Sequence, residues 1–452
     1  MNETERKVLE KISPTEEYRI NLKEILKEIR NKLSKEIKKR NLPVEIILVG
    51  SIAKDTYLMN NMDIDLFLCF PTSFSKEKIS EESLSIGKNI LKNTEESYAE
   101  HPYIRGYYNN YYVEIVPCYK IENAKQKLSA VDRTPLHTEY VKKHLKESQK
   151  QEVRLFKQFL KGINCYGAEA QIQGFSGYLC EILILYYDNF ENLIKNSSEW
   201  TKGIKLSLEN IEETPEFDTP LIFIDPVDFE RNVASALIYE KFKLFKKAST
   251  EYLKNSSITF FFPKPTEPWS LEKIEKEIKK ENAKDIGIRF NEPDIIDENL
   301  YPQIRKAEKS IKDACERNDF KIYDSTFYIN EKDREIYIII KTDKNDLSKT
   351  RIHQGPPLKM EKNVKDFKNK WEKNDRLVRF ITEKNRINVE IKRRYTKIEE
   401  FLDDNLSDFS LGSQLDKVIS NNFEILEEKK LITNKLKLFW TEYLDKKYSW
   451  ER

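Results

Sequence analysis

Several residue types are scarce in this chain of 452 residues. It has four His and five Cys, and the Cys residues are odd in number, lie mostly in apolar runs and have no Cys-x-x-Cys spacing. Zinc and disulfide frameworks are therefore poor interpretations, and so is a His-based metal or acid/base centre. The free thiols predict a reducing, cytoplasmic compartment.

Long apolar runs and a strong net charge are also missing. The most apolar helix candidate, residues 178–187, is far shorter than the ~20 residues that a membrane span needs, so we expect a soluble protein. Lys and Arg number 79 against 77 Asp and Glu, a formal charge of +2, so RNA affinity must come from local basic patches. The sequence has no Gly-x-x-x-x-Gly-Lys loop and no visible Ser or Cys triad.

The most informative segment follows the strand-like run at residues 44–49. Gly50 ends that run where a tight turn brings backbone N–H groups close to an anion, and Ser51 adds a hydroxyl donor. A second apolar run then begins with Asp63 and Asp65, which period-two alternation places on one face. A lone Asp-x-Asp is usually a solvated pair, but the preceding Gly-Ser turn favours a phosphate and metal site.

A third acid, Glu114, lies in the strand-like run at residues 111–119. A charge among apolar neighbours is costly unless it is paired or bound to metal. Three hard oxygen ligands without His or Cys suit Mg²⁺, and two such ions can activate a hydroxyl nucleophile and stabilise leaving pyrophosphate. Asp63, Asp65 and Glu114 are therefore the expected catalytic metal ligands. The spacing of the turn and the acids resembles the polymerase β-like nucleotidyltransferase superfamily.

Further blocks are similar to the class I, archaeal-type CCA-adding enzymes. They are residues 98–103, 116–119, 131–135, 152–157, 166–169, 174–181, 225–228, 231–234, 293–297 and 299–303. The resemblance spans the first two thirds of the chain and thins out afterwards. It implies template-independent addition of two cytidines and one adenosine to the 3′ end of tRNA from CTP and ATP, with two Mg²⁺ ions and contacts to the acceptor arm.

The same resemblance implies a set of nucleotide-binding residues. Gly50, Ser51 and Lys54 would lie against the triphosphate; Thr134, His137, Lys157 and Tyr166 would contact the triphosphate or ribose; and Arg231 would read the incoming base. The sequence departs from the family pattern with Lys54 where Arg is common, Glu114 where Asp is common and Asp63 where Glu is common. Each acid can still bind a hard cation, while Lys54 offers a point charge instead of a bidentate fork.

Two of these residues have plainer readings from their local sequence. Proline steps at Pro215 and Pro226 bracket a loop that would carry Arg231 towards the site, but Arg231 at a helix start also reads as a surface salt bridge. His137 also reads as a helix-terminus histidine. Both alternatives stay open at the level of sequence.

The expected fold class is α+β and multidomain. Apolar periodicity predicts helices at residues 20–37 and 76–92, which would back a mixed sheet in a nucleotidyltransferase domain at 1–147. Helical patterning, including a stretch from Val233 to Phe245, predicts a mostly helical central domain at 148–264 that contacts the nucleotide base and tRNA.

A C-terminal α/β tRNA-binding body and tail is expected at 265–452, after a proline pair. Its predicted helices are 270–280 and 301–317, and its predicted strands are 286–290, 321–329 and 335–341. A basic patch at 376–395 contains the RNA-binding candidates Arg379, Arg393 and Arg394. The same segment reads equally as a strand pair with its basic side chains in water.

Two other functions compete with CCA addition. A poly(A) polymerase or another terminal RNA nucleotidyltransferase needs the same acids but appends many identical residues. A non-catalytic RNA-binding protein of the same fold is a third reading, against which the three intact acids argue.

Overall fold

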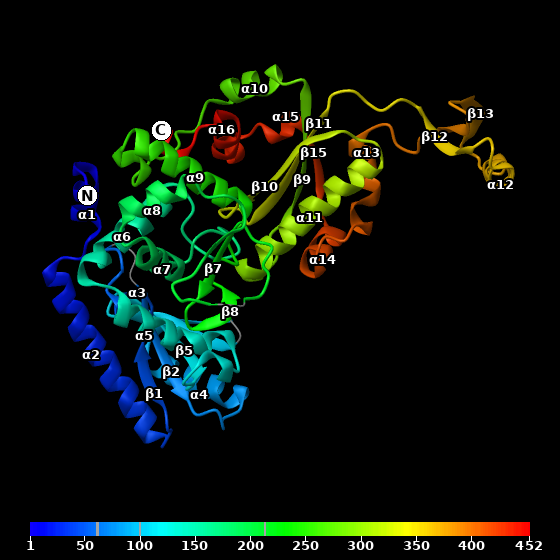
Figure 1. Ribbon diagram of the computed structural model, residues 1–452. Helices are drawn as coiled ribbons and strands as arrows, with labels where there is room; N and C mark the ends of the chain where they lie inside the picture. The colour runs from blue at the N-terminus through cyan, green and yellow to red at the C-terminus, as the bar shows by residue number, and fades with distance from the viewer. Residues whose placement is uncertain (60–62, 99–100, 212–213) are drawn as a thin grey trace. The chain divides into compact units, whose positions relative to one another are not determined.

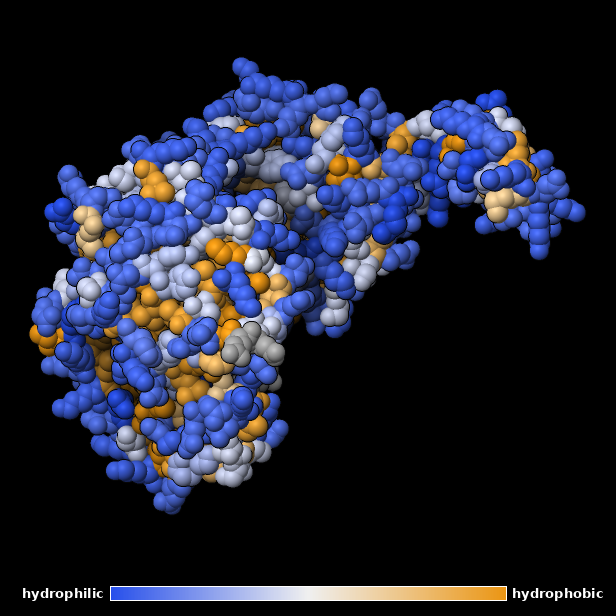
Figure 2. Space-filling model, in the orientation of Figure 1, coloured by the Kyte–Doolittle hydropathy of each residue, from blue (hydrophilic) through white to orange (hydrophobic). Residues whose placement is uncertain are grey.

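The structure is a computed structural model that describes residues 1–59, 63–98, 101–211 and 214–452. Two positions of the sequence block at 98–103 therefore lie outside the described residues. The chain divides into two compact units (Figure 1): residues 1–265 together with 448–452, and residues 266–447. Hydrophilic side chains cover most of the face shown in Figure 2, as expected for a chain with 35% charged residues.

The first unit begins with a five-stranded mixed sheet in the order β1-β2-β5-β4-β3. β2 and β5 are parallel, and the other neighbours are antiparallel. The strands are β1 (Glu45–Leu48), β2 (Asp63–Phe70), β3 (Lys92–Tyr98), β4 (Pro102–Tyr108) and β5 (Tyr111–Tyr119), and the helices are α1 (Glu3–Ile12), α2 (Glu16–Lys39), α3 (Gly50–Lys54), α4 (Lys76–Ile90) and α5 (Thr134–His144). The mixed sheet and the two helices that sequence periodicity predicted are confirmed.

The two faces of this sheet differ in what covers them. Ile64, Leu66 and Leu68 of β2 are buried in one core with apolar residues of α2 and α4, because alternate residues of a strand share a face. Asp63 and Asp65 therefore project from the opposite face of the same strand. The two helices thus leave the acidic face of the sheet uncovered.

The rest of the first unit is mostly helical, with a small sheet that sequence periodicity did not reveal. Its helices are α6 (Glu147–Gly162), α7 (Gly177–Tyr187), α8 (Phe190–Ser197) and α9 (Tyr239–Lys254), and its strands are β6 (Ile204–Leu206), β7 (Leu221–Asp225) and β8 (Asp228–Asn232) in the order β6-β7-β8. Aromatic rings fill the helical core, in which the Phe245 ring contacts both Phe156 and Phe159.

Two local predictions in this region are wrong. Arg231 lies on β8 and not at a helix start, because the Pro226-Val227 turn sends the chain back as an antiparallel strand. The helix predicted from Val233 begins only at Tyr239, since residues 233–236 form turns after the strand.

The last residues that the structure describes complete the first unit. Trp450 is buried and stacks on Phe260, with ring centroids 5.3 Å apart, and its indole N–H donates to Glu251 at 2.7 Å. The Ser449 hydroxyl donates to the Gly162 carbonyl at 2.7 Å. A segment far away in sequence therefore closes this core.

The second unit has a four-stranded sheet in the order β10-β11-β9-β15 and a three-stranded sheet in the order β12-β14-β13. The strands are β9 (Ala283–Asn291), β10 (Ile322–Asn330), β11 (Glu335–Asp343), β12 (Thr350–Pro357), β13 (Leu377–Glu383), β14 (Arg386–Lys392) and β15 (Glu424–Glu427). The helices are α10 (Leu271–Lys280), α11 (Asp297–Arg317), α12 (Glu361–Glu372), α13 (Ile398–Asn405), α14 (Ser413–Asn421), α15 (Glu428–Leu431) and α16 (Lys437–Asp445).

The predicted helix-strand-helix-strand-strand order of this unit is confirmed by α10, β9, α11, β10 and β11. The strand pair predicted at 376–395 is β13 with β14. Across the described parts of the chain, the helices are all too short or too polar to cross a membrane.

Candidate active site

The turn after β1 packs directly against β2, the strand that carries Asp63 and Asp65. Gly50 has φ +70°, and a Cβ added there would lie 1.9 Å from Oδ2 of Asp65, so the position requires glycine. The Val49 N–H donates to the Asp65 carbonyl at 3.0 Å, which holds the turn beside β2. Ser51 is half-buried in the short helix α3 that follows. The predicted phosphate-binding turn and the predicted metal ligands therefore lie side by side.

The three acids share one sheet face. In the parallel pair β2-β5, Asp65 is directly opposite Glu114 and Asp63 is opposite Tyr112. Burial, the Glu114 carboxylate and the Asp63 carboxylate raise the pKa of Asp65 to about 7. Burial also raises the pKa values of Glu114 and Asp63. Negative charge is thus concentrated here beyond what the local bases offset, an arrangement that a divalent cation would relieve.

This donor set fits a hard divalent metal ion, since all its ligand atoms are carboxylate oxygens. The strand register supports the assignment by placing the acids on one face. Within residues 1–59, 63–98, 101–211 and 214–452, no three His, Cys, Asp or Glu side chains are already arranged around a common point as metal ligands. The face therefore supplies the donors, while their side chains are not yet turned to a shared centre.

Lys54 and Lys157 share a buried carboxylate that sequence reasoning did not assign. The Glu181 side chain is fully buried and accepts from Lys54 Nζ at 2.5 Å, from Thr56 Oγ1 at 2.6 Å and from Lys157 Nζ at 3.4 Å. Burial alone would raise the pKa of Glu181, but Lys54 and Lys157 outweigh it and hold the pKa below its ordinary value. The formal charges of two lysines and one carboxylate sum to +1 beside the acidic face, although burial lowers the pKa of Lys157.

A second buried carboxylate organises His137 and Arg231. Asp225 Oδ2 lies 2.8 Å from His137 Nε2 and accepts from Arg231 Nη1 at 2.9 Å. Its Oδ1 accepts from the Tyr178 hydroxyl at 3.1 Å, and the Tyr178 ring stacks on His137 with centroids 4.1 Å apart. Burial lowers the pKa of His137 despite Asp225, so the imidazole is neutral at pH 7. Arg231 therefore has a buried partner and is not a surface salt bridge.

The remaining predicted residues border these clusters. Lys54 Nζ lies 6.0 Å from the centroid of the Tyr178 ring, which connects the lysine pair to the Asp225 cluster. Tyr166 is half-buried, and Lys161 Nζ lies 5.5 Å from its ring centroid. Thr134 is half-buried at the first position of α5, the helix that carries His137. All eight predicted nucleotide-binding residues thus lie in the first unit.

Asp225 and Glu181 are the residues that sequence reasoning missed. Glu181 sits in the apolar run of α7, where a buried acid signals a required partner just as Glu114 does in β5. Asp225 ends the apolar strand β7 before a proline, a weaker signal. Most of their partners come from distant segments: His137, Tyr178, Thr56 and Lys54 lie 47 to 127 positions away in sequence, so periodicity could not reveal them.

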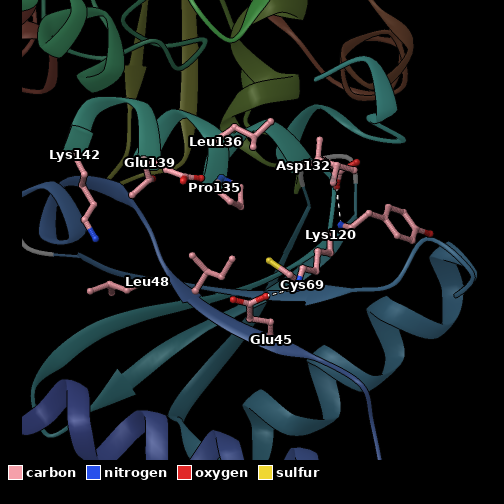
Figure 3. A pocket seen from close by; sticks show the side chains of 13 residues that line it. Glu45, Leu48, Cys69, Lys120, Asp132, Pro135, Leu136, Glu139 and Lys142 are labelled. Carbon is pink, nitrogen blue, oxygen red and sulfur yellow. Dashed lines mark hydrogen bonds and ion pairs between the residues drawn. The ribbon is translucent and has the colours of Figure 1, made fainter. Parts of the chain in front are cut away.

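A separate cavity of about 370 Å³ lies on the same side of the sheet (Figure 3). It is bounded by β1, the distal end of β2 at Cys69, and α5 at Leu136 and Glu139. Asp132, fully buried, fixes its wall by accepting from the Tyr119 N–H at 2.8 Å. Asp63, Asp65 and Glu114 do not line this cavity, so it is separate from the predicted metal ligands.

The three RNA-binding candidates lie in the second unit. Arg379 is 70% exposed and donates to Glu390 at 2.7 Å. Arg393 is 14% exposed and is paired with Asp319. The guanidinium carbon of Arg394 lies 5.1 Å from the centroid of the Tyr395 ring.

The mixed sheet, the Gly-Ser turn and the aligned acids define a polymerase β-like nucleotidyltransferase, a class that uses nucleotide substrates with divalent metal ions. Residues 30–137 match the nucleotidyltransferase domain, 151–262 match the second domain of tRNA nucleotidyltransferases, and 283–428 match the C-terminal domain of CCA-adding enzymes. The chain belongs to the CCA-adding enzyme family, and it is a tRNA nucleotidyltransferase by that membership.

Full-length relatives agree with these matches. The chain is 34% identical to the CCA-adding enzyme of Methanosarcina acetivorans, covering 93% of both chains. It is 35% identical to that of Archaeoglobus fulgidus over 94% of both chains. It is 36% identical to that of Thermoplasma volcanium over 91% of this chain and 90% of the relative.

Proposed function

We propose that this protein adds C, C and A to the 3′ end of tRNA, using CTP and ATP and releasing pyrophosphate. The observation that carries the proposal is the β2-β5 register, which aligns Asp65 with Glu114 beside the Gly50 turn. The CCA-adding enzymes that cover nearly the whole chain support the same reaction.

Asp63, Asp65 and Glu114 are proposed to hold two Mg²⁺ ions. Bound there, the ions would lower the pKa of the RNA 3′-hydroxyl and would offset charge on the leaving pyrophosphate. The RNA 3′-hydroxyl loses its proton to water, and its oxygen forms a bond to the α-phosphorus. The bond from the α-phosphorus to the oxygen that bridges the α and β phosphates breaks, and pyrophosphate leaves with that electron pair.

The positive residues are proposed to orient the nucleotide. Gly50 and Ser51 face the triphosphate with a backbone turn and a hydroxyl, and Lys54 and Lys157 supply the positive charge that Glu181 keeps fixed in place. Thr134, His137 and Tyr166 contact the triphosphate or ribose. Arg231, which the ion pair with Asp225 holds in place, recognises the base of the incoming nucleotide. A guanidinium donor fork can distinguish base edges that present different acceptors.

The larger organisation is also part of this proposal. We assign residues 1–147 to catalysis, 148–264 to base and tRNA contacts, and 265–452 to binding the tRNA acceptor arm. The reaction is placed in the cytoplasm, where the free thiols of the chain would stay reduced.

The test is extension of tRNA that lacks its terminal trinucleotide, with products sized at single-nucleotide resolution. We expect two additions with CTP alone and a third only when ATP is also present. Long ladders with ATP would instead indicate a poly(A) polymerase, and binding without extension would indicate a non-catalytic RNA-binding protein.

Asp65→Asn tests the metal assignment in the same assay. It should lower the extension rate at least ~10³-fold, since it removes a charged ligand from the metal face. Folding should be unaffected or improved, because burial and neighbouring carboxylates already disfavour the Asp65 charge. Glu95→Gln, an exposed acid on β3, is the matched control and should retain full activity. Near wild-type extension by Asp65→Asn would disprove the assignment.

A further inference from the structure

Four arginines of the second unit surround one small cavity. The cavity measures about 40 Å³ and is lined by Arg351, Arg376, Arg393, Arg394, Phe320 and Tyr395. Arg351 belongs to β12, Arg376 precedes β13, and Arg393 and Arg394 follow β14. The fold therefore brings guanidinium groups from three separate segments to one place; we call this the arginine pocket.

The charges of the arginine pocket are largely uncompensated. Asp319 accepts from Arg351 Nη1 at 3.0 Å and also pairs with Arg393. The nearby Glu390 carboxylate is already taken by Arg379 and by the Thr350 hydroxyl, each at 2.7 Å. Two of the four guanidinium groups thus share one carboxylate, and the four arginines together with Asp319 carry a formal charge of +3.

Several donors in the arginine pocket lack an acceptor. Nε of Arg393 is buried without a partner, whereas Arg376 is half-buried and Arg394 is exposed. Across the residues that the structure describes, the guanidinium groups of Arg376 and Arg394 have no hydrogen bond or ion pair to another side chain. A buried donor without an acceptor is costly, and clustered like charges repel. An anion bound in the cavity would accept a hydrogen bond from the unpaired donor and would reduce the repulsion between the clustered positive charges.

We propose that the arginine pocket binds a backbone phosphate of the RNA substrate. The guanidinium fork matches phosphate oxygens in a bidentate manner, and a cavity of about 40 Å³ is too small for a nucleoside. The Tyr395 ring beside Arg394 provides an aromatic face next to the phosphate. This inference rests on the proposed function, because it takes the RNA to be tRNA.

The proposal separates the sequence-predicted arginines. Arg393 and Arg394 belong to the arginine pocket, and Arg351 and Arg376 join them. Arg379 does not, because it is exposed on β13 and occupied by Glu390. Arg379 is therefore a control of the same residue type, from the same small sheet.

The experiment measures binding of the full-length protein to tRNA lacking its terminal trinucleotide, over a series of KCl concentrations. Arg376→Ala and Arg394→Ala should each raise Kd about three- to tenfold near 0.1 M salt and reduce the slope of log K against log salt by about 1. Arg379→Ala should change both values less than either pocket variant does. In extension assays, KM for tRNA should rise while KM for CTP and kcat stay at wild-type values.

The possible outcomes are distinct. Wild-type Kd and salt slope in both pocket variants, with unchanged thermal unfolding, would overturn the proposal. A rise in KM for CTP without a change in tRNA binding would show that the arginine pocket takes a free nucleotide phosphate instead. Failure of the wild-type protein to extend tRNA would refute the proposed function, while the binding comparison would still report on the arginine pocket.

Discussion

At the residue scale, Asp225 joins three groups that come from different elements. It lies on β7, fully buried, and bonds His137 of α5, Tyr178 of α7 and Arg231 of β8. A single carboxylate thus fixes both the neutral imidazole and the cation proposed to read the base. Asp225 acts as a positioning residue in this reading, since its own oxygens are occupied by protein donors.

Asp225→Asn should weaken nucleotide selection more than the chemical step. Hydrogen bonds to charged groups contribute about 1.5–3 kcal/mol, so a loosened Arg231 should raise KM for CTP about tenfold or more. Incorporation of UTP relative to CTP should increase, while kcat changes less. Steady-state kinetics with each nucleotide checks this expectation.

Asp228→Asn is the matched control for Asp225→Asn. Asp228 pairs with two cations, Lys127 and Arg133, each at 2.8 Å, and it lies only three residues from Asp225. It has no bond to His137 or Arg231 among the described residues. Equal loss of nucleotide selection in both variants would mean that Asp225 has only a structural role.

Glu181→Gln should destabilise the first unit. The change leaves Lys54 and Lys157, which are 8% and 2% exposed, without their anionic partner. Breaking a buried ion pair in this way costs about 3–5 kcal/mol. Urea unfolding should show a lower midpoint, whereas Glu191→Gln, an exposed surface acid, should leave the midpoint unchanged.

The stability that Glu181 contributes should depend on pH in one direction only. The pKa of Glu181 is held below its ordinary value of 4.5 by Lys54 and Lys157, although burial alone would raise it. Its ionised form therefore stabilises the fold at pH values above 4.5, and this contribution disappears as pH falls through the lowered pKa. The stability difference between wild type and Glu181→Gln should persist at neutral pH and narrow in acid. A constant difference down to strongly acidic pH would contradict this account.

Single residues of the candidate site could be predicted from the sequence, but the partners that hold other site residues in place could not. Asp63, Asp65 and Glu114 were predictable because each acid interrupts apolar alternation within a strand. The bonds that Asp225 and Glu181 make connect residues 47 to 127 positions apart for His137, Tyr178 and Lys54, and those distances in sequence leave no local pattern. Burial of an acid was visible in the sequence, but its partner was not.

At the element scale, the turn from β1 into α3 combines unusual backbone with close packing. Gly50→Ala would add a Cβ that clashes with Asp65 Oδ2 and would force an alanine to adopt φ +70°. The backbone strain alone costs roughly 1–2 kcal/mol, while the clash displaces a proposed metal ligand. We expect extension to fall at least ~10²-fold, because small displacements of reacting groups have effects of this size.

Gly203→Ala is a control that separates the effect of backbone strain from the effect of displacing Asp65. Gly203 has φ +82°, but an added Cβ would have no heavy atom within 4 Å. Gly203→Ala should therefore lose about as much stability to backbone strain as Gly50→Ala does, but it should extend tRNA at the wild-type rate. Equal activity in the two variants would show that the contact between Gly50 and Asp65 does not matter for catalysis.

The elements that sequence patterns missed share a physical cause. β3 has the polar sequence Lys-Asn-Thr-Glu-Glu-Ser-Tyr and lies at the edge of its sheet, so alternation is weak. β6, β7 and β8 have only 3 to 5 residues each, too few to establish a period. Helix α2 and strands β2 and β5 were predictable because each is long enough to show a period and has a clear apolar pattern. Pairing with a neighbour, and not local preference, forms the missed strands.

At the scale of the whole molecule, the first unit depends on residues 448–452. Trp450→Ala should lower the free energy of unfolding by about 3 kcal/mol, a typical value for removing a buried aromatic ring. It removes the stacking on Phe260 and the bond to Glu251. Trp450→Phe, which keeps a ring but not the N–H, should lose less. Urea denaturation of both variants measures the difference, and equal losses would assign the stabilisation to the indole N–H alone.

The return of residues 448–452 also sets an order in time during synthesis. The ribosome must make residues 266–447 before Trp450 can reach Phe260. At roughly 5–20 residues per second this takes on the order of 10 to 40 s. During that interval the core around Phe260 lacks one of its rings, so the part of the protein that is translated first becomes complete last.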